Sequence, residues 1–248
     1  MNILIVNDDG ILAPGILALT EAAAQRGHKI TVYAPDEQRS AASHCITLTA
    51  PLRCKKMESY PGGATAYAVN GSPADCARLG IFREREHAPI DFVLSGINKG
   101  PNRGTATLYS GTVGAAMEAS LCGIGALAVS LCSHEDRDYE IAAQLGVRVM
   151  EWAVDFPLPL GMIYSLNVPK TDVIPEVRPA SLSREYIFDP IYEKHEDGSY
   201  TFVTGKDLYP YEPDSDTALT NAGYSSLSVL TWNLLHALPD ITGLNKEN

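Results

Sequence analysis

The stretch Ile3-Leu4-Ile5-Val6-Asn7-Asp8-Asp9-Gly10 places four consecutive apolar residues directly before a polar, turn-forming cluster. An apolar run without alternation is typical of a parallel strand that is covered on both faces, and the polar cluster marks the point where the strand enters its loop. A helix is predicted over Ile16–Arg26, with Gly27 as the residue that ends it, and a second strand over Ile30–Ala34. This βαβ unit predicts a parallel sheet with a right-handed crossover.

Strands and helices continue to alternate as far as about residue 180. A second helix is predicted to open at Pro73, because the side chain of Ser72 suits a helix cap and Asp75 lies in the first turn. Residues 45–48 and 52–57 are predicted to pair as a hairpin. The sequence therefore predicts an α/β fold in which helices flank a mostly parallel sheet. The remaining predicted elements are helices over 111–121 and 137–153 and strands over 67–69, 92–94, 126–131 and 162–168.

The character of the chain changes beyond about residue 180. Residues Tyr186–Val203 alternate in polarity and contain Asp197-Gly198, a pair typical of hairpin turns, so a protruding β-hairpin arm is predicted. We expect this arm to pack on a partner, which favours a homo-oligomer. A strand (Leu227–Leu230) and a helix (Thr231–Leu238) are predicted in the C-terminal extension. We expect residues 1–248 to form one domain, with a core of about 1–180 and an arm and tail of about 181–248.

The charge of the chain limits its ligands. The formal net charge is −11, from 19 basic and 30 acidic residues. An acidic surface repels nucleic-acid backbones, which argues against binding to duplex nucleic acid. It also repels phosphate substrates at long range, so an enzyme that acts on phosphates would need a strong local positive centre. A bound metal ion would supply one.

No membrane or secretion segment is expected. The N-terminus lacks a basic region followed by a long apolar one. The longest apolar region, Ala119–Cys132, is too short to span a bilayer and contains two glycines. The five cysteines form no Cys-x-x-Cys pair, which favours free thiols in a reducing cytoplasm.

The polar cluster after the first strand places two adjacent carboxylates where open α/β sheets bind ligands. Asp8 and Asp9 repel each other, and a cation such as Mg²⁺, Mn²⁺ or Ca²⁺ would compensate for that repulsion. Asn, Asp and Gly also dominate ordinary turns, so this cluster by itself leaves both interpretations open.

Two further loops carry candidate ligands. The segment from Ser95 to Gly104 follows a predicted strand, so it should approach the first loop in space. In it, Asn98 offers a neutral oxygen and Asn102 an amide donor. Shortly after the second strand, the hydroxyl of Ser40 could bind a metal ion and Arg39 could bind an anion. Taken alone, either segment fits a plain loop better than a binding site.

The segment Tyr109-Ser110-Gly111-Thr112-Val113-Gly114 opens an alanine-rich helix. Free backbone N–H groups at a helix N-terminus, with two hydroxyls beside them, suit an anion. Ser110 could also be no more than the N-cap of this helix.

Taken together and in this order, these motifs resemble the survival protein E (SurE) nucleotidase family. The resemblance covers about residues 1–170, with weaker matches at 216–218 and 223–224. Residues 71–76 and 166–169 also resemble the family pattern, whereas 189–194 and 225–230 depart from it. These departures leave the oligomeric geometry and the preferred base open.

The resemblance implies a site and an activity. It implies a Rossmann-like core, a homodimer or homotetramer, and hydrolysis of nucleoside 5′- and 3′-monophosphates, in some members also of short polyphosphate. It implies one divalent metal ion per subunit, Mg²⁺ or Mn²⁺, bound by Asp8, Asp9, Ser40 and Asn98. The family's phosphate-binding residues match Asn102, Ser110, Gly111 and Thr112, and Asn7 also lies in the family's active site.

We expect hydrolysis by direct attack of metal-activated water. His44 lies between Ser43 and Cys45, but neighbouring side chains on an extended chain point apart, so a covalent intermediate is not indicated. Asp8 or Asp9 could orient the water, and the sequence leaves this choice open.

Other classes fit less well. A non-catalytic nucleotide-binding protein could use the same phosphate loop, and this alternative stays open. A receiver-type signalling domain needs a phosphoacceptor aspartate after a later strand, but residues 54–60 contain none. A haloacid-dehalogenase phosphatase needs Asp-x-Asp, whereas these aspartates are adjacent.

Overall fold

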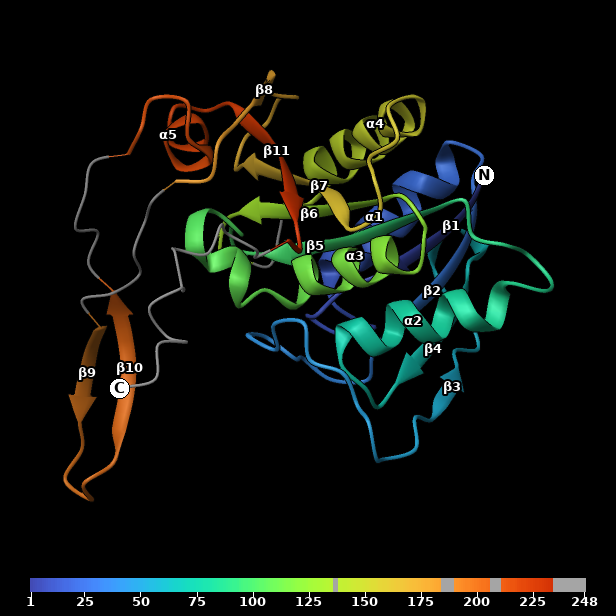
Figure 1. Cartoon of the computed structure of the whole chain (residues 1–248), viewed down its shortest axis with the longest axis horizontal. Helices are drawn as coiled ribbons and strands as arrows, with labels where there is room; N and C mark the ends of the chain where they lie inside the picture. The colour runs from blue at the N-terminus through green and yellow to red at the C-terminus, as the bar shows by residue number, and fades with distance from the viewer. Residues whose placement is uncertain (136–137, 184–189, 206–210, 234–248) are drawn as a thin grey trace, which may run out of the picture.

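Helices cover both faces of a mixed, mostly parallel β-sheet in the computed structural model of the chain (Figure 1), which describes residues 1–135, 138–183, 190–205 and 211–233. The strands of the sheet are β1 (Asn2–Val6), β2 (Lys29–Pro35), β3 (Cys54–Lys56), β4 (Thr65–Val69), β5 (Phe92–Lys99), β6 (Ala126–Cys132), β7 (Met162–Pro169), β8 (Val177–Pro179) and β11 (Ser225–Thr231). The helices are α1 (Pro14–Gln25), α2 (Pro73–Glu84), α3 (Gly111–Leu121), α4 (Glu140–Asp155) and α5 (Asp216–Asn221), with 3-10 turns η1 (Pro61–Gly63) and η2 (Gly104–Leu108).

The strand order confirms the predicted fold class. It runs β3-β4-β2-β1-β5-β6-β7-β11-β8. The β3–β4 and β7–β11 pairs are antiparallel, and the other pairs are parallel. The structure confirms the first βαβ unit, and β1 and β5 lie side by side at the middle of the sheet. Their carboxyl ends therefore share one edge, where the loops after the two strands meet.

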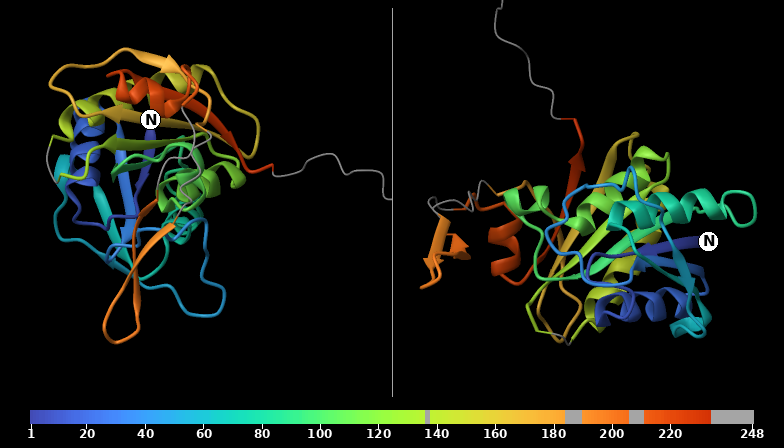
Figure 2. Two further views of the ribbon diagram at one scale, coloured as in Figure 1. Left: turned by 90° about the vertical axis from the view of Figure 1, so that its left-hand side faces the viewer. Right: turned by 90° about the horizontal axis from the view of Figure 1, so that it is seen from below.

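Alternate residues of β1 build two cores. Ile3 and Ile5 pack with α1 and α4, whereas Leu4 and Val6 pack with α2 and α3. All four side chains are fully buried. Figure 2, right, shows the sheet lying between these two pairs of helices. Burial on both faces explains why the strand is a continuous apolar run rather than an alternating one.

Three predicted elements differ in the structure. The hairpin of 45–48 with 52–57 is wrong, because β3 pairs with β4 and the backbone N–H of Thr47 donates to the Asp75 carboxylate at 2.9 Å. The strand predicted over 92–94 continues to Lys99, with a register shift against β6 between Ser95 and Asn98. The C-terminal helix is predicted from Thr231, which lies in β11; residues 234–238 are outside the described part of the chain.

The predicted arm is a hairpin of β9 (Pro190–Lys194) and β10 (Tyr200–Gly205). The turn between them contains Gly198, whose φ of +85° suits glycine, and its N–H donates to the His195 carbonyl at 3.0 Å. In Figure 1 the hairpin stands apart from the sheet, on the side toward which β6 and β7 point. Residues 186–189 of the predicted arm lie outside the described residues.

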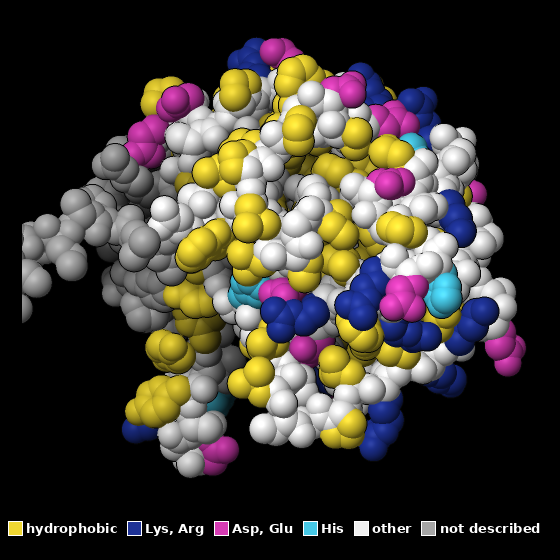
Figure 3. All heavy atoms as spheres, turned by 45° about the vertical axis from the view of Figure 1, so that its right-hand side comes forward, with side chains coloured by type: hydrophobic (Ala, Val, Ile, Leu, Met, Phe, Trp, Pro, Cys, Tyr) yellow, Lys and Arg dark blue, Asp and Glu magenta, His cyan; other side chains and the backbone are white. Residues whose placement is uncertain are grey.

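Two surface features bear on the predicted ligands. On the face shown in Figure 3, acidic and basic side chains lie beside one another, so the excess negative charge does not form one acidic patch there. Among the described residues, no helix combines the length and the apolar character needed to cross a membrane.

Candidate active site

The loops that follow β1 and β5 meet at the carboxyl edge of the sheet. The backbone N–H of Lys99 donates to Asp9 Oδ2 at 2.9 Å, although the two residues are 90 positions apart. The side chain of Asp8 lies on the other side of the same loop, against the start of α3. The predicted convergence of separate loops is therefore present in the structure.

Asp8 is a buried carboxylate with two donors from one residue. It is 3% exposed and accepts hydrogen bonds from the hydroxyl of Thr112 at 2.5 Å and from its backbone N–H at 3.2 Å. Burial raises the pKa of Asp8 to about 6, the Thr112 hydrogen bonds oppose this shift, and the neighbouring Asp9 charge adds to it. The hydrogen bonds that the protein donates to ionised Asp8 therefore do not fully offset the cost of burying its charge.

The other predicted metal ligands lie close by. The amide of Gln38 bridges Ser40 Oγ at 2.8 Å and Asp9 Oδ1 at 3.4 Å. The amide nitrogen of Asn98 donates to the Gly100 carbonyl at 2.8 Å, so its oxygen is the atom suited to coordinate a cation. A cavity of about 440 Å³ is lined by Asp8, Ser40, Ala41, Asn98, Lys99, Asn102, Ala106, Tyr109, Ser110, Tyr192 and Phe202. Asp9 instead borders the adjacent hollow beside Gln38 and Lys99.

This donor set fits a hard divalent cation. Two carboxylates, a hydroxyl and an amide oxygen are the ligand types that Mg²⁺ and Mn²⁺ prefer. A cation would also offset the burial and mutual repulsion of Asp8 and Asp9. The described residues contain no group of three or more His, Cys, Asp or Glu side chains that could hold a metal ion. A metal ion at the two aspartates would therefore need further oxygen ligands, and Ser40 and Asn98 are the predicted ones.

Two of the predicted phosphate-binding side chains line the cavity. Ser110 is the N-cap of α3, and its Oγ accepts from the N–H of Val113 at 3.1 Å. Asn102 is held from both sides: its N–H donates to Asn167 Oδ1 and its amide nitrogen donates to Ser130 Oγ, both at 2.8 Å. These contacts fix the positions of both residues beside the predicted metal site.

Gly111 and Thr112 contact Asp8. A Cβ at Gly111 would lie 2.8 Å from the Cβ of Asp8, so a larger residue there would displace the carboxylate. The hydroxyl and the N–H of Thr112 both donate to Asp8. Contacts from these residues to a phosphate stay a prediction, and the structure gives them a second role in positioning Asp8.

Asn7 and Arg39 hold the loops in shape. Asn7 is fully buried and closes the turn, since its amide nitrogen donates to the Gly10 carbonyl at 2.9 Å and its oxygen accepts from the Gly10 N–H at 3.2 Å. The N–H of Arg39 donates to the Asp8 carbonyl at 2.7 Å, while its guanidinium pairs with Glu37 at 2.7 Å. Both residues therefore support the aspartate loop through their own hydrogen bonds.

Known proteins are similar to this chain in sequence and in structure. The family model described as survival protein SurE matches residues 3–187 of the 248 residues. The chain belongs to the SurE family. Several curated SurE proteins are similar along most of its length. A 5′-nucleotidase SurE from Nostoc sp. is 37% identical over 262 residues, covering 99% of this chain and 97% of that relative.

Two further SurE relatives and one SurE crystal structure are also similar to this chain. A 5′-nucleotidase SurE from Synechococcus sp. (strain JA-3-3Ab) is 41% identical and covers 98% of this chain and 93% of its own. The one from Synechococcus sp. (strain CC9902) is 48% identical over 170 residues, which is 68% of this chain and 63% of that relative. The crystal structure of the SurE protein from Aquifex aeolicus matches with a TM-score of 0.79 and 29% identity, over 95% of each chain.

Sequence reasoning gave no role to four charged or aromatic residues that line the cavity of this SurE-family chain. One of them is Lys99, and its position between Asn98 and Gly100 was the signal that could have found it. Tyr109, Tyr192 and Phe202 bring aromatic rings. No sequence signal predicts that Tyr192 and Phe202 line the cavity, because their place there depends on where the hairpin lies relative to the core.

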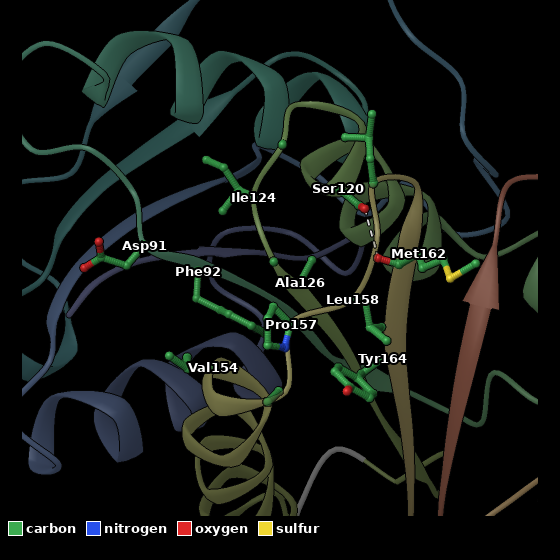
Figure 4. Close-up of a pocket in the computed structure, with 14 residues that line it drawn as sticks. Asp91, Phe92, Ser120, Ile124, Ala126, Val154, Pro157, Leu158, Met162 and Tyr164 are labelled. Atoms are coloured by element: carbon green, nitrogen blue, oxygen red, sulfur yellow. Dashed lines mark hydrogen bonds between the residues drawn. The ribbon is translucent and has the colours of Figure 1, made fainter.

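A second cavity, of about 230 Å³, lies at the opposite edge of the sheet (Figure 4). It is bordered by Phe92 and Ala126, the first residues of β5 and β6, and by Ile124, Leu158 and Tyr164. The hydroxyl of Ser120 beside it donates to the Met162 carbonyl at 2.9 Å. This cavity lies at the amino ends of the strands and is largely apolar, so we do not assign the chemistry to it.

Proposed function

We propose that this chain is a divalent-metal-dependent nucleotidase that releases phosphate from nucleoside 5′- and 3′-monophosphates. The observation that carries the proposal is that Asp8, Ser40, Asn98, Asn102 and Ser110 border one cavity at the carboxyl edge of the sheet. The names of the Nostoc and Synechococcus relatives, 5′-nucleotidase SurE, support the same activity.

The proposed metal ligands are Asp8, Asp9, Ser40 and Asn98, with one Mg²⁺ or Mn²⁺ ion per subunit. When bound, such an ion polarises a phosphoryl oxygen and lowers the pKa of water toward about 7 in favourable sites. One of the two aspartates orients the attacking water. Asp9 is held by the Lys99 N–H at 2.9 Å and Asp8 by Thr112, so neither carboxylate is free to turn away.

The phosphate is proposed to lie between Asn102 and Ser110, with Gly111 and Thr112 beneath it. Donors fixed in place before the reaction stabilise the charge on the equatorial oxygens without reorganising. Asn102 meets this condition because Ser130 and Asn167 hold it, both at 2.8 Å. Removing one such donor costs roughly 3 kcal/mol, or on the order of a hundredfold in rate.

The proposal also covers a second substrate, the oligomeric state and the cellular compartment. We propose that short polyphosphate is also a substrate, that the protein is a homodimer or homotetramer, and that it acts in the cytoplasm. All five cysteines are unpaired, which supports a reducing compartment.

A phosphate-release screen tests the proposed activity. Nucleoside 5′- and 3′-monophosphates and tripolyphosphate are incubated with the protein and Mg²⁺, Mn²⁺ or a chelator. We expect release that requires the metal, and a loss of at least about a hundredfold in Asp9→Asn. Asp155→Asn is the matched control, because it makes the same charge change at the end of α4. Binding of a nucleotide without any release would favour the non-catalytic alternative, and unchanged turnover in Asp9→Asn would overturn the assignment.

A further inference from the structure

The residues that line the cavity at the carboxyl edge fall into two chemically different groups. Asp8, Ser40, Asn98 and Ser110 are polar, whereas Tyr109, Tyr192 and Phe202 are aromatic. We propose that these rings form a subsite in which the nucleobase of the substrate stacks, with the arm of the same chain forming its outer wall. This inference rests on the proposed nucleotidase function and extends it to base recognition.

The arm presents its two rings together. Tyr192 on β9 and Phe202 on β10 are cross-strand partners, and their ring centroids lie 5.7 Å apart at an interplanar angle of 67°. Their side chains stay about half exposed, at 57% and 48%, although they border a cavity. Aromatic faces left open inside a cavity are available for a flat apolar group.

Tyr109 connects the proposed base subsite to the proposed phosphate site along the chain. Tyr109 directly precedes Ser110, the N-cap of α3, and is 46% exposed. Its backbone carbonyl accepts from the N–H of Ser43 at 2.9 Å, which ties this position to the loop that carries Ser40. A nucleoside monophosphate offers a partner to both groups of lining residues, because it carries an aromatic base and a phosphate on one ribose. The cavity volume of about 440 Å³ lies within the range of small-molecule sites.

The residues that line the cavity also indicate which bases the subsite would distinguish. Apart from the residues proposed to bind the metal ion or the phosphate, the cavity is lined by Ala41, Lys99, Ala106, Tyr109, Tyr192 and Phe202, of which Lys99 and the tyrosines carry side-chain hydrogen-bonding groups. Stacking tolerates any base, because every base has a π-face, and larger rings stack over more area. The subsite should therefore favour purines over pyrimidines and discriminate little between adenine and guanine.

The test compares two phosphate esters of ribose, one with a base and one in which a hydroxyl replaces the base. We would measure kcat/KM of the full chain for adenosine 5′-monophosphate and for ribose 5-phosphate. In Tyr192→Ala and in Phe202→Ala, the ratio of the two values should fall about tenfold or more, the order expected when a stacked base loses its aromatic partner. Tyr192→Phe should keep the ratio, because it keeps the ring.

Phe82→Ala is the matched control, since Phe82 is an exposed aromatic of α2, outside the arm, that does not border the cavity. Its ratio should equal that of the unmodified chain. A ratio unchanged in both cavity variants, or one that falls equally in Phe82→Ala, would overturn the aromatic subsite. Absence of phosphate release from both esters in the unmodified chain would instead count against the nucleotidase function itself.

Discussion

Asp8 shows how a single residue links function to stability. The folded protein buries this carboxylate beside Asp9, and burial raises its pKa from 3.8 to about 6. Below about pH 4 the group is protonated in both the folded and the unfolded state, so it costs no stability. Above about pH 6 it is ionised in both states. Its contribution then lowers the free energy of unfolding by about 3 kcal/mol relative to that below pH 4.

Asp8→Asn should therefore stabilise the metal-free protein while it removes activity. An asparagine can still accept from the Thr112 N–H and donate to its hydroxyl, so both present hydrogen bonds have a counterpart. In urea unfolding with a chelator at neutral pH, we expect a gain of up to about 3 kcal/mol that disappears near pH 4. Added Mn²⁺ should raise the unfolding midpoint of the unmodified chain and leave that of the variant in place.

The charge-matched control for this prediction is again Asp155→Asn, at the exposed end of α4. It should show neither the gain at neutral pH nor the lost response to Mn²⁺. Equal stability of Asp8→Asn and the unmodified protein at neutral pH, or equal protection of both by Mn²⁺, would contradict the role given to Asp8.

The sequence could predict which residues form the site better than it could predict what each one contacts. Asp8, Asp9 and Asn98 follow predicted strands, and parallel strands bring their carboxyl ends to one edge. Thr112 is predicted to bind phosphate, but its hydroxyl and N–H donate to Asp8. The sequence pattern at the helix N-terminus is the same whether Thr112 donates to a phosphate or to Asp8. The pattern identifies the donor, and only the folded structure shows the acceptor.

At the scale of elements, β5 has to change register to present Asn98. Its pairing with β6 shifts between Ser95 and Asn98, and Gly96 within the shift has a φ of +142°. Ser95 is polar but fully buried, with its hydroxyl donating to the Thr112 carbonyl at 2.7 Å. The apolar run ends before Ser95, so the sequence predicts a shorter strand, whereas the backbone of β5 pairs with β6 again at Asn98 and Lys99.

Gly96→Ala should damage both the fold and the metal site. A Cβ there would lie 2.3 Å from the Val129 carbonyl oxygen on β6, so either strand must move. We expect a loss of about 1–3 kcal/mol or more in urea unfolding, as for other overpacked positions, together with weaker protection by Mn²⁺ because Asn98 is displaced.

Gly27→Ala is the control that separates the cost of a positive φ from the cost of a steric clash. Gly27 also has a positive φ, +81°, but a Cβ at this position would meet no heavy atom within 4 Å beyond its immediate neighbours. The variant should lose only about 1–2 kcal/mol and keep the full response to Mn²⁺. A Gly96→Ala protein that matched Gly27→Ala in both measurements would show that β5 does not need its glycine.

At the scale of the whole molecule, the arm is a two-stranded hairpin that exposes large apolar side chains. Tyr200 on β10 is 61% exposed and Val203 is 54% exposed, in addition to the two rings at the cavity. A two-stranded hairpin is only marginally stable in water without further packing. The turn and the alternation of the sequence predict the hairpin, but the surface that covers it depends on assembly. The division into a core of about 1–180 and an arm and tail likewise stays a prediction.

We expect a second copy of the chain to cover the outer part of the arm. Sedimentation velocity should give a dimer or tetramer for the unmodified protein. The double variant Tyr200→Glu/Val203→Glu should shift it toward single chains, because burying two unpaired charges in an apolar contact is strongly unfavourable. Leu48→Glu is the control, since Leu48 is 83% exposed in a loop outside the arm and its substitution should leave the assembly intact. If the unmodified chain sediments as a monomer, or if the double variant assembles as before, the arm is not the contact between copies.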